Sequence, residues 1–216
     1  MGSRMLSDTL NLEGYPVNRK RIQRLMRLMG IEAIYPKQKL TVRNPEHEIY
    51  PYLLRGKTIT FKNQVWSTDI TYIPVKMGFL YLVAVIDWFS RFVLSWRLSN
   101  SLSNDFCIEA LLEAFELYGI PNIFNTDQGS QFTSLNFINE LKRREISISM
   151  DGKGRALDNV YIERLWRTVK YEEVYLKDYY DGKYAFESLN TFFAHYNFTR
   201  PHSELNKKPP SYTYLQ

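Results

Sequence analysis

Two aspartates stand where apolar runs of the sequence give way to polar turns. Asp69 lies inside the β-branched and aromatic run "VWSTDITYIPV", and Asp127 ends the short run "NIFNTD". An ionised carboxylate at the edge of a packed core is costly unless a cation or hydrogen-bond donors meet it. If the two runs form neighbouring strands, about 4.8 Å apart, the acids converge on one face of the sheet. A divalent cation such as Mg²⁺ would offset their repulsion, because it is usually held by one or two carboxylates, substrate phosphate and water.

A third oxygen donor is available in "DNVYIERLWRTVKYEEVY", which has the spacing of an amphipathic helix. Glu163 shares one stripe of this helix with Arg167 and Lys170, at i+4 and i+7. The apolar residues of the segment can face the core: Ile162, Leu165, Trp166 and Val169. The competing interpretation is an ion pair within the helix, worth only about 0.3 to 0.5 kcal/mol. Taken alone, the stripe favours the ion pair.

Other titratable residues compete for the role of metal ligand. Asp87, in "VIDWFSR", is also in a strand-like run, but an acid followed by Ser90 and Arg91 is typical of a stabilised turn. Asp158 opens the last long helix, where a capping role is expected. The histidines are too scattered for a zinc site, and we expect the last of them to pack or to contact phosphate: His47, His195 and His202.

The acids must be positioned by secondary structure, and the pattern of apolar and polar residues after residue 64 predicts strands and helices that could do so. Three strand-like runs with tight breaks predict an antiparallel meander over 65–75, 78–90 and 91–99. The pattern then predicts a helix over 103–118, a strand over 122–127, a helix over 134–145, a strand over 146–150, a Gly-rich loop over 151–159 and a long helix over about 159–176. The order is βββαβαβα.

The N-terminal part of the chain is basic. Residues 1–64 hold 12 Lys/Arg and 5 Asp/Glu, a net charge of +7, whereas residues 65–216 hold 16 and 18, a net charge of −2. The segment "VNRKRIQRLMRLMG" predicts an amphipathic helix with Ile22, Leu25, Met26 and Met29 on its apolar side. A shorter helix before "GYP" would complete a helix-turn-helix outline. Residues 36–63, with three prolines and little periodicity, are expected to form a basic linker.

The composition excludes several classes of protein. With 44% hydrophobic and 15% aromatic residues among 216, the chain is expected to fold into a globular core with a small appended domain. The single cysteine, Cys107, rules out an internal disulfide, suits a reducing cytoplasm and is expected to be buried. No run has the length of a membrane span and the start has no signal-peptide core, so no membrane partner is expected.

Three blocks of the sequence together resemble a known family. They are "VWSTDITYI", "NTDQGSQFTS" and "DNVYIERLWRTVKYE", and 35 residues separate Asp127 from Glu163. This is similar to the D,D-35-E pattern of integrase-type transposases of bacterial insertion sequences, in particular the catalytic subunit of the insertion sequence 3 family. "FSRFVLSW" and "YNFTRPHSELNKKPPSYTY" resemble further signatures of that family. The resemblance covers the chain from about residue 14 to its end.

The resemblance implies a fold and a division of the chain. The fold is α/β, an RNase H-like core with a mixed five-stranded sheet flanked by helices, preceded by a small helix-turn-helix-like segment. The expected parts are a partial DNA-binding segment over 1–35, the basic linker over 36–63, and a catalytic domain with a helical tail over 64–216. Because relatives generally have several dozen further residues at the start, the chain is expected to be N-terminally truncated.

The implied activity is DNA transposition, that is, metal-dependent cleavage and strand transfer in a bacterial cytoplasm, at the nucleoid. Asp69, Asp127 and Glu163 would hold two Mg²⁺ ions, for which Mn²⁺ can substitute. The implied partners are double-stranded DNA, as element ends and target, and further copies of the chain. Basic residues are expected to bind DNA phosphates: Lys20, Arg24, Arg27, Lys153, Arg155, Arg164, Arg167 and Lys170.

The sequence leaves two alternatives and shows some departures from the family pattern. A nuclease of the same fold would cut DNA without joining it, and a decayed remnant of an element would bind DNA without catalysis. Asn125 stands where the family often has His, followed by Ser or Thr, and "KKPP" replaces a common Thr-Pro. Neither departure touches an expected ligand.

Overall fold

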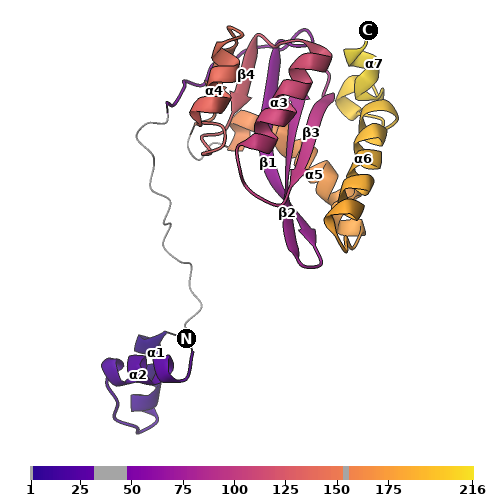
Figure 1. Cartoon of the computed structure of the whole chain (residues 1–216). Coiled ribbons are helices and arrows are strands. Elements are labelled where there is room, and N and C mark those ends of the chain that lie inside the picture. Colours follow the sequence, from indigo (N-terminus) through magenta and orange to yellow (C-terminus); the bar gives the residue numbers. More distant parts are fainter. Residues whose placement is uncertain (1, 32–47, 153–155) are drawn as a thin grey trace. The chain divides into compact units, whose positions relative to one another are not determined.

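The computed structural model describes residues 2–31, 48–152 and 156–216, and its contacts divide the chain into two compact units (Figure 1). The first unit is Met1–Arg43 and the second is Asn44–Gln216. Each unit is described by itself.

The first unit contains two helices, as the sequence predicts. Helix α1 spans Ser3–Leu12 and α2 spans Arg19–Leu28, where Asn18 caps α2 by accepting a hydrogen bond from the Arg21 N–H at 2.9 Å. The side chain of Asn11 closes the intervening turn, because it both donates to the Val17 carbonyl and accepts from the Val17 N–H. Ile22 and Met26 are buried between the helices, but Met29, expected on the apolar side, follows the last turn and is 60% exposed.

The second unit is built on a mixed five-stranded sheet in the order β3-β2-β1-β4-β5. Its strands are β1 (Val65–Val75), β2 (Gly78–Asp87), β3 (Val93–Ser99), β4 (Ile123–Thr126) and β5 (Ser147–Met150). The first three pair antiparallel, whereas β4 pairs parallel with both β1 and β5. The predicted meander and the predicted neighbourhood of the Asp69 and Asp127 strands are therefore confirmed.

Helices cover both faces of this sheet (Figure 1). The face with β1 residues Val65 and Ile73 packs on α5 (Val160–Glu172) and α6 (Gly182–Phe198). The other face packs on α3 (Asp105–Tyr118) and α4 (Leu135–Lys142). Short turns and a last helix complete the unit: η1 (Ala156–Asn159), η2 (Val174–Leu176), η3 (Ser203–Leu205) and α7 (Pro210–Tyr214). Since the inner strands are buried on both sides, they read as long apolar runs in the sequence.

Residues 48–63 differ from the expected linker. Leu54 is buried in the core beside α5, the Leu53 N–H donates to Ser149 Oγ at 3.1 Å, and the Tyr52 hydroxyl donates to the Asp158 carbonyl at 3.2 Å. This part of the segment therefore belongs to the packed unit, while residues 36–47 of the expected linker lie outside the described residues. The lack of periodicity in this segment predicted a linker. Residues 48–63 instead form a strap, which is held in place by contacts with residues far away in the sequence.

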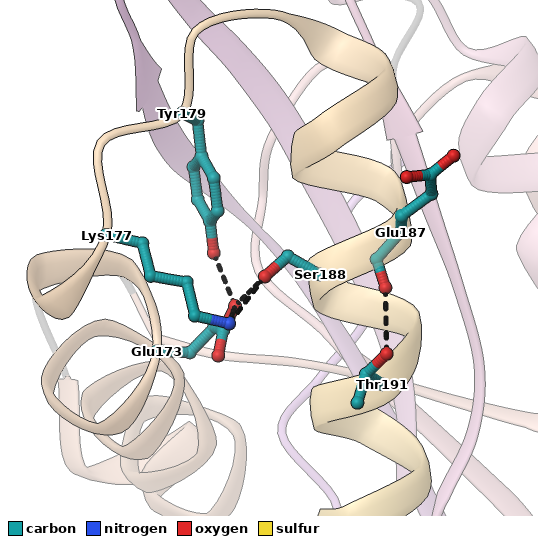
Figure 2. Close-up of polar contacts among 6 residues, drawn as sticks. All are labelled: Glu173, Lys177, Tyr179, Glu187, Ser188 and Thr191. Carbon is teal, nitrogen blue, oxygen red and sulfur yellow. Dashed lines mark hydrogen bonds and ion pairs between the residues drawn. The ribbon is translucent and has the colours of Figure 1, made fainter.

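The helix expected over about 159–176 ends early, at a buried carboxylate shown in Figure 2. Glu173 breaks the helix between α5 and η2, and its side chain is only 7% exposed. Its Oε1 accepts hydrogen bonds from Tyr179 at 2.8 Å and Ser188 at 2.5 Å, and lies 2.9 Å from Lys177 Nζ (Figure 2). A buried carboxylate is tolerated when it is paired and hydrogen-bonded in this way. The network ties the end of α5 to α6 and so fixes the helix that carries Glu163.

Two predictions about the class of protein can be compared with the structure. Cys107 is buried, as expected, and burial raises the pKa of its thiol to about 12. No helix within the described residues has the length and apolar character needed to cross a membrane.

Candidate active site

The sheet register brings the segments that carry Asp69 and Asp127 next to each other. In the parallel pair of β1 and β4, Ser67 lies opposite Asn125, and the two acids follow two residues further along each chain. Because side chains two apart in a strand point to the same face, Asp69 lies on the face of β1 that carries Val65 and Ile73, toward α5. The charge of Asp127 raises the pKa of Asp69, so the two carboxyl groups lie within electrostatic reach of each other. Asp127 is the first residue beyond β4, so it stands at the carboxyl edge of the sheet. Strand pairing alone therefore brings together two acids that are 58 positions apart in the sequence.

Asp69 is held in a partly buried setting. Burial raises the pKa of its carboxyl to about 7, and the negative charges of Asp127 and Glu163 act in the same direction. Two donors oppose this shift: the Trp166 indole, whose Nε1 lies 2.8 Å from Asp69 Oδ2, and the backbone N–H of Ile70. A carboxyl group with this pKa is partly protonated near neutral pH.

Asp127 shapes the turn that follows its strand. Its Oδ1 accepts a hydrogen bond from the Gly129 N–H at 2.8 Å, which lowers the pKa of the carboxyl, while burial outweighs this and raises it. A Cβ at position 129 would lie 2.8 Å from Asp127 Oδ1, closer than real Cβ contacts. The glycine in "TDQGSQ" therefore lets the backbone approach the carboxylate closely.

Glu163 lies in the first turn of α5, and its side chain is exposed. Its charge raises the pKa of both Asp69 and Asp151, so it lies within electrostatic reach of the two aspartates. No three His, Cys, Asp or Glu side chains in the described part of the chain are gathered closely enough to hold a metal ion as they stand. Asp127 and the exposed Glu163, at the rim of this neighbourhood, thus lie within electrostatic reach of Asp69, and joint binding of a metal by the three carboxylates stays a prediction.

Asp151 is a fourth acid at this edge, and it was not predicted from the sequence. It follows β5, its N–H donates to the Thr126 carbonyl at 2.9 Å, and its Oδ1 accepts from Asn125 Nδ2 at 2.8 Å. Burial raises its pKa to about 6, with smaller contributions from Asp158, Asp127 and Glu163. The signal in the sequence was its position directly after the run "ISISM". The same position after "NIFNT" identified Asp127.

The two competing acids have structural roles. Asp87 is fully buried and stabilises the turn after β2, because it accepts hydrogen bonds from Ser90 N, Ser90 Oγ and Asn63 N, as predicted. The capping role expected for Asp158 is wrong. Asn159 occupies the N-cap position of α5, and Asp158 instead accepts a hydrogen bond from the Gly152 N–H at 3.0 Å. The Asp158 carboxylate thus closes the loop after β5.

The basic residues expected to bind phosphate have different surroundings. In the first unit, Lys20, Arg24 and Arg27 are exposed on α2. Along α5, the Arg164 guanidinium is 2.6 Å from Glu204, which also pairs with Arg91 at 3.1 Å. Arg167 lies over the Tyr171 ring, with 5.9 Å to the ring centroid, and Lys170 is half-buried. Lys153 and Arg155 lie outside the described residues.

A groove of about 590 Å³ lies beside this face of α5. Arg164, Arg167 and Thr168 line one side, and the segment with Arg200 and His202 lines the other. Burial, followed by the charges of the surrounding arginines, lowers the pKa of His202, so the imidazole is neutral at physiological pH. Cations therefore surround the groove, although Glu172 and Glu204 neutralise part of their charge.

The raised pKa of Asp69 predicts how stability depends on pH in the absence of metal. The carboxyl has its ordinary pKa of 3.8 in the unfolded chain and about 7 in the folded one. The folded state therefore binds the proton more tightly, and its contribution to stability is lost as the pH rises from about 4 through about 7. At pH 8, above both pKa values, the difference between them corresponds to about 4 kcal/mol, so Asp69→Asn should raise the free energy of unfolding by up to about this amount relative to wild type, and at pH 4 by little.

Urea unfolding of both proteins with a chelator, across this pH range, measures the difference. Added Mg²⁺ should stabilise the wild type at pH 8 more than Asp69→Asn. A difference between the two proteins that does not change with pH would contradict the raised pKa.

The fold of the second unit is similar to solved integrase cores. The catalytic core domain of the HTLV-2 integrase, solved in complex with magnesium, superposes with a TM-score of 0.57 and 22% identity, over 71% of this chain and 97% of that one. A chain of the simian T-cell lymphotropic virus intasome in complex with the PP2A regulatory subunit B56 gamma superposes with a TM-score of 0.64 and 18% identity, over 99% of this chain and 74% of that one. These similarities establish an RNase H-like, integrase-type fold.

Sequence comparison identifies the family. Profiles described as integrase core domain match residues 60–156 and 144–210, and one described as HTH-like domain matches residues 1–39. The transposase for insertion sequence element IS904 of Lactococcus lactis is 32% identical over 215 residues, 97% of this chain and 85% of that protein. Transposase InsF for insertion sequence IS3A of Escherichia coli is 32% identical over 176 residues, which span 79% of this chain but 61% of that protein. The chain therefore belongs to the family of insertion-sequence transposases that carry an integrase core domain.

Proposed function

We propose that the protein is a DNA transposase that cleaves DNA strands and joins them to a target in a metal-dependent reaction. The observation that supports the proposal is the pairing of β1 with β4, together with the charges of Asp127 and Glu163 acting on Asp69, which indicates that the three acids share one neighbourhood. Membership of the transposase family supports the same reaction.

The donor set fits magnesium. Asp69, Asp127 and Glu163 offer only carboxylate oxygens, the ligands that this ion prefers. Burial, with a smaller contribution from the charges of Asp127 and Glu163, raises the pKa of Asp69. Mg²⁺ needs only one or two of them, with phosphate and water supplying the rest, so the rim position of Glu163 is compatible with binding. Two ions bound there would activate a water or a DNA 3′-hydroxyl and stabilise the leaving 3′-oxygen; Mn²⁺ is expected to substitute.

The protein's own residues supply position and charge. Asp69, Asp127 and Glu163 would hold the ions through their carboxylate oxygens. Positioning carries most of the catalysis in phosphoryl transfer, since no covalent bond to the protein is required. The sheet that carries Asp69, and the end of α5 that is anchored through Glu173, would provide this positioning. Lys153, Arg155, Arg164, Arg167 and Lys170 would hold phosphates beside the acids.

Each of the two units is expected to contact DNA in a different way. The exposed basic face of α2, with Lys20, Arg24 and Arg27, would contribute to binding of the element ends, and the core would act on those ends and on the target. Because cleavage and joining involve two element ends, we propose that several copies of the chain assemble on DNA. The bacterial nucleoid, in the cytoplasm, is the place where such a substrate is found.

Strand joining tests the proposal most specifically. A duplex that carries the element's terminal repeat is pre-cut to leave a free 3′-hydroxyl, labelled at its 5′ end and incubated with the protein, supercoiled target and Mg²⁺. We expect labelled DNA to become covalently attached to the target. Cleavage of an uncut substrate without joining would indicate a nuclease of the same fold, and binding without either reaction would indicate a remnant without catalysis. Either outcome would overturn the transposase proposal.

The basic residues of α5 predict a change in the salt dependence of DNA binding. Arg167→Ala and Lys170→Ala should each lower the slope of log K against log salt concentration by roughly 0.7 to 0.9, because a phosphate that the protein no longer neutralises keeps its condensed counterion. Arg164→Ala should change it less, since Glu204 already engages that guanidinium. Fluorescence anisotropy with a labelled duplex, from low to moderate salt, measures the slope.

Lys183→Ala is the matched control for this measurement. Lys183 is exposed at the start of α6, where Gly182 lies beside Leu80 of the β1–β2 hairpin. Lys183→Ala should leave the slope of log K against log salt concentration unchanged. An unchanged slope in Arg167→Ala and Lys170→Ala as well would remove these two residues from the DNA-binding surface.

A further inference from the structure

Trp166 donates its only hydrogen bond to the acid at the centre of the candidate site. Its side chain packs in the core between α5 and the sheet, where the residue is 4% exposed. The indole Nε1 nevertheless lies 2.8 Å from Asp69 Oδ2. The sequence predicts the core position from the helical spacing, but not the target of the N–H group. A core position alone could equally be filled by Phe or Leu, which have no N–H to satisfy.

The hydrogen bond restricts the carboxylate. Rotation about the last torsion of an aspartate is soft and roughly two-fold, so an unrestrained Asp69 would present either oxygen in many orientations. The Trp166 indole holds Oδ2, while the Ile70 N–H also contacts the carboxyl group. A buried indole N–H without an acceptor would cost about 1 to 3 kcal/mol, which keeps the pair together. The remaining lone pairs of Asp69 are thereby held in one arrangement.

The same contact sets the distance between two acids on different elements. Trp166, which is buried, lies three positions after the exposed Glu163, so the two residues stand about one turn apart on α5. Asp69 lies on β1. A hydrogen bond from Trp166 to Asp69 therefore ties the turn that carries Glu163 to the strand that carries Asp69. Glu163, at the rim, is the acid whose position most needs such a constraint.

We propose that Trp166 is a positioning residue for divalent metal binding, which acts by orienting the Asp69 carboxylate and by fixing the first turns of α5 against β1. The inference rests on the proposed function, because it assumes that Asp69 is a metal ligand. Groups that hydrogen-bond to ligands typically change metal affinity by 10- to 100-fold when they are removed. Trp166 is expected to act within this range.

The chain contains a matched control for the loss of a buried indole hydrogen bond. Trp88 is 5% exposed in the same core, and its Nε1 donates to Ser67 Oγ at 2.8 Å. Ser67 lies on β1 two residues before Asp69, on the same face of the sheet. Trp88→Phe and Trp166→Phe therefore remove the same kind of bond to the same strand, but only the second removes a bond to a carboxylate.

Metal binding to the full chain without DNA tests the proposal. Mn²⁺ is titrated into wild type, Trp166→Phe and Trp88→Phe, and free Mn²⁺ is followed by electron paramagnetic resonance. We expect Trp166→Phe to weaken Mn²⁺ binding at least tenfold and Trp88→Phe to change it less than twofold. Equal affinity of Trp166→Phe and wild type would overturn the proposal, and so would equal weakening in both variants.

A second measurement keeps the test valid if Trp166→Phe does not fold. In the ¹⁵N-labelled wild type, the indole N–H resonances are assigned and Mg²⁺ is added. The Trp166 signal should shift with the binding curve of the metal, and more than the Trp88 signal. A Trp166 signal that stays in place while Mg²⁺ saturates would contradict the proposal.

The outcome also separates this inference from the proposed function. If Asp127→Asn abolishes Mn²⁺ binding but Trp166→Phe leaves it unchanged, the inference alone fails. If the wild type binds no Mn²⁺, the inference and the proposed function fail together.

Discussion

Asp127→Asn is expected to abolish cleavage and strand joining while DNA binding stays within about twofold of wild type. The substitution replaces a charged metal ligand with a neutral amide. It keeps the Oδ1 acceptor that binds the Gly129 N–H, so the turn after β4 can remain intact. We expect the rate to fall at least about 10³-fold, which corresponds to about 4 kcal/mol of transition-state stabilisation. Single-turnover cleavage of a labelled end measures the rate, and anisotropy measures the binding.

Asp105→Asn is the control for this change. Asp105 is exposed in the first turn of α3, which covers the opposite face of the sheet, and its loss should leave the rate within about twofold. Activity of Asp127→Asn within tenfold of wild type would show that Asp127 is not an essential ligand. Loss of DNA binding in the same variant would indicate a disturbed fold instead of a missing ligand.

Asp87→Ala is expected to destabilise the second unit by about 3 to 5 kcal/mol. The Asp87 side chain is fully buried and accepts three hydrogen bonds, from Asn63 N at 2.8 Å, Ser90 N at 2.8 Å and Ser90 Oγ at 2.6 Å. Alanine would leave these donors unpaired in a site closed to water. Urea unfolding, followed by far-UV circular dichroism, measures the loss.

Asp87→Asn provides the comparison. The amide keeps one acceptor oxygen, so the cost should be smaller, about 1 to 3 kcal/mol. Metal affinity should be unaffected in the fraction of Asp87→Asn that remains folded. If Asp87→Ala cost less than about 1 kcal/mol, or if Asp87→Asn lost metal binding without losing stability, Asp87 would have a role in the site instead of the turn.

Local patterns in the sequence predict much of this fold and part of the site. Alternating and β-branched runs identify the five strands, and the positions of Asp69 within one run and Asp127 after another identify two acids at the site. Their convergence depended on β1 and β4 being neighbours, which the pairing of Ser67 with Asn125 confirms. The turn role of Asp87 was also predictable, because Ser90 follows it at the spacing of an Asx-type turn.

Features fixed by long-range contacts were not predictable. Helical spacing places Trp166 in the core, but only the pairing of α5 with β1 shows that its N–H meets Asp69. Residues 48–63 lack periodicity because their backbone hydrogen bonds go to residues far away in the sequence, such as the bond from the Leu53 N–H to Ser149. Asp158 follows the rule for a helix N-cap, yet the loop after β5 brings Gly152 closer. For Trp166 and the strap a long-range contact decides between roles that the local sequence allows equally, and for Asp158 the conformation of its own loop does.

Crystals of the protein grown with Mn²⁺ and measured at the manganese absorption edge would show whether the two aspartates hold the metal. We expect anomalous density within about 2.1 Å of carboxylate oxygens of both Asp69 and Asp127, with Glu163 drawn toward the same ions. A fully occupied manganese site elsewhere on the protein, with Asp69 and Asp127 free of metal, would contradict a metal-dependent reaction at this sheet edge.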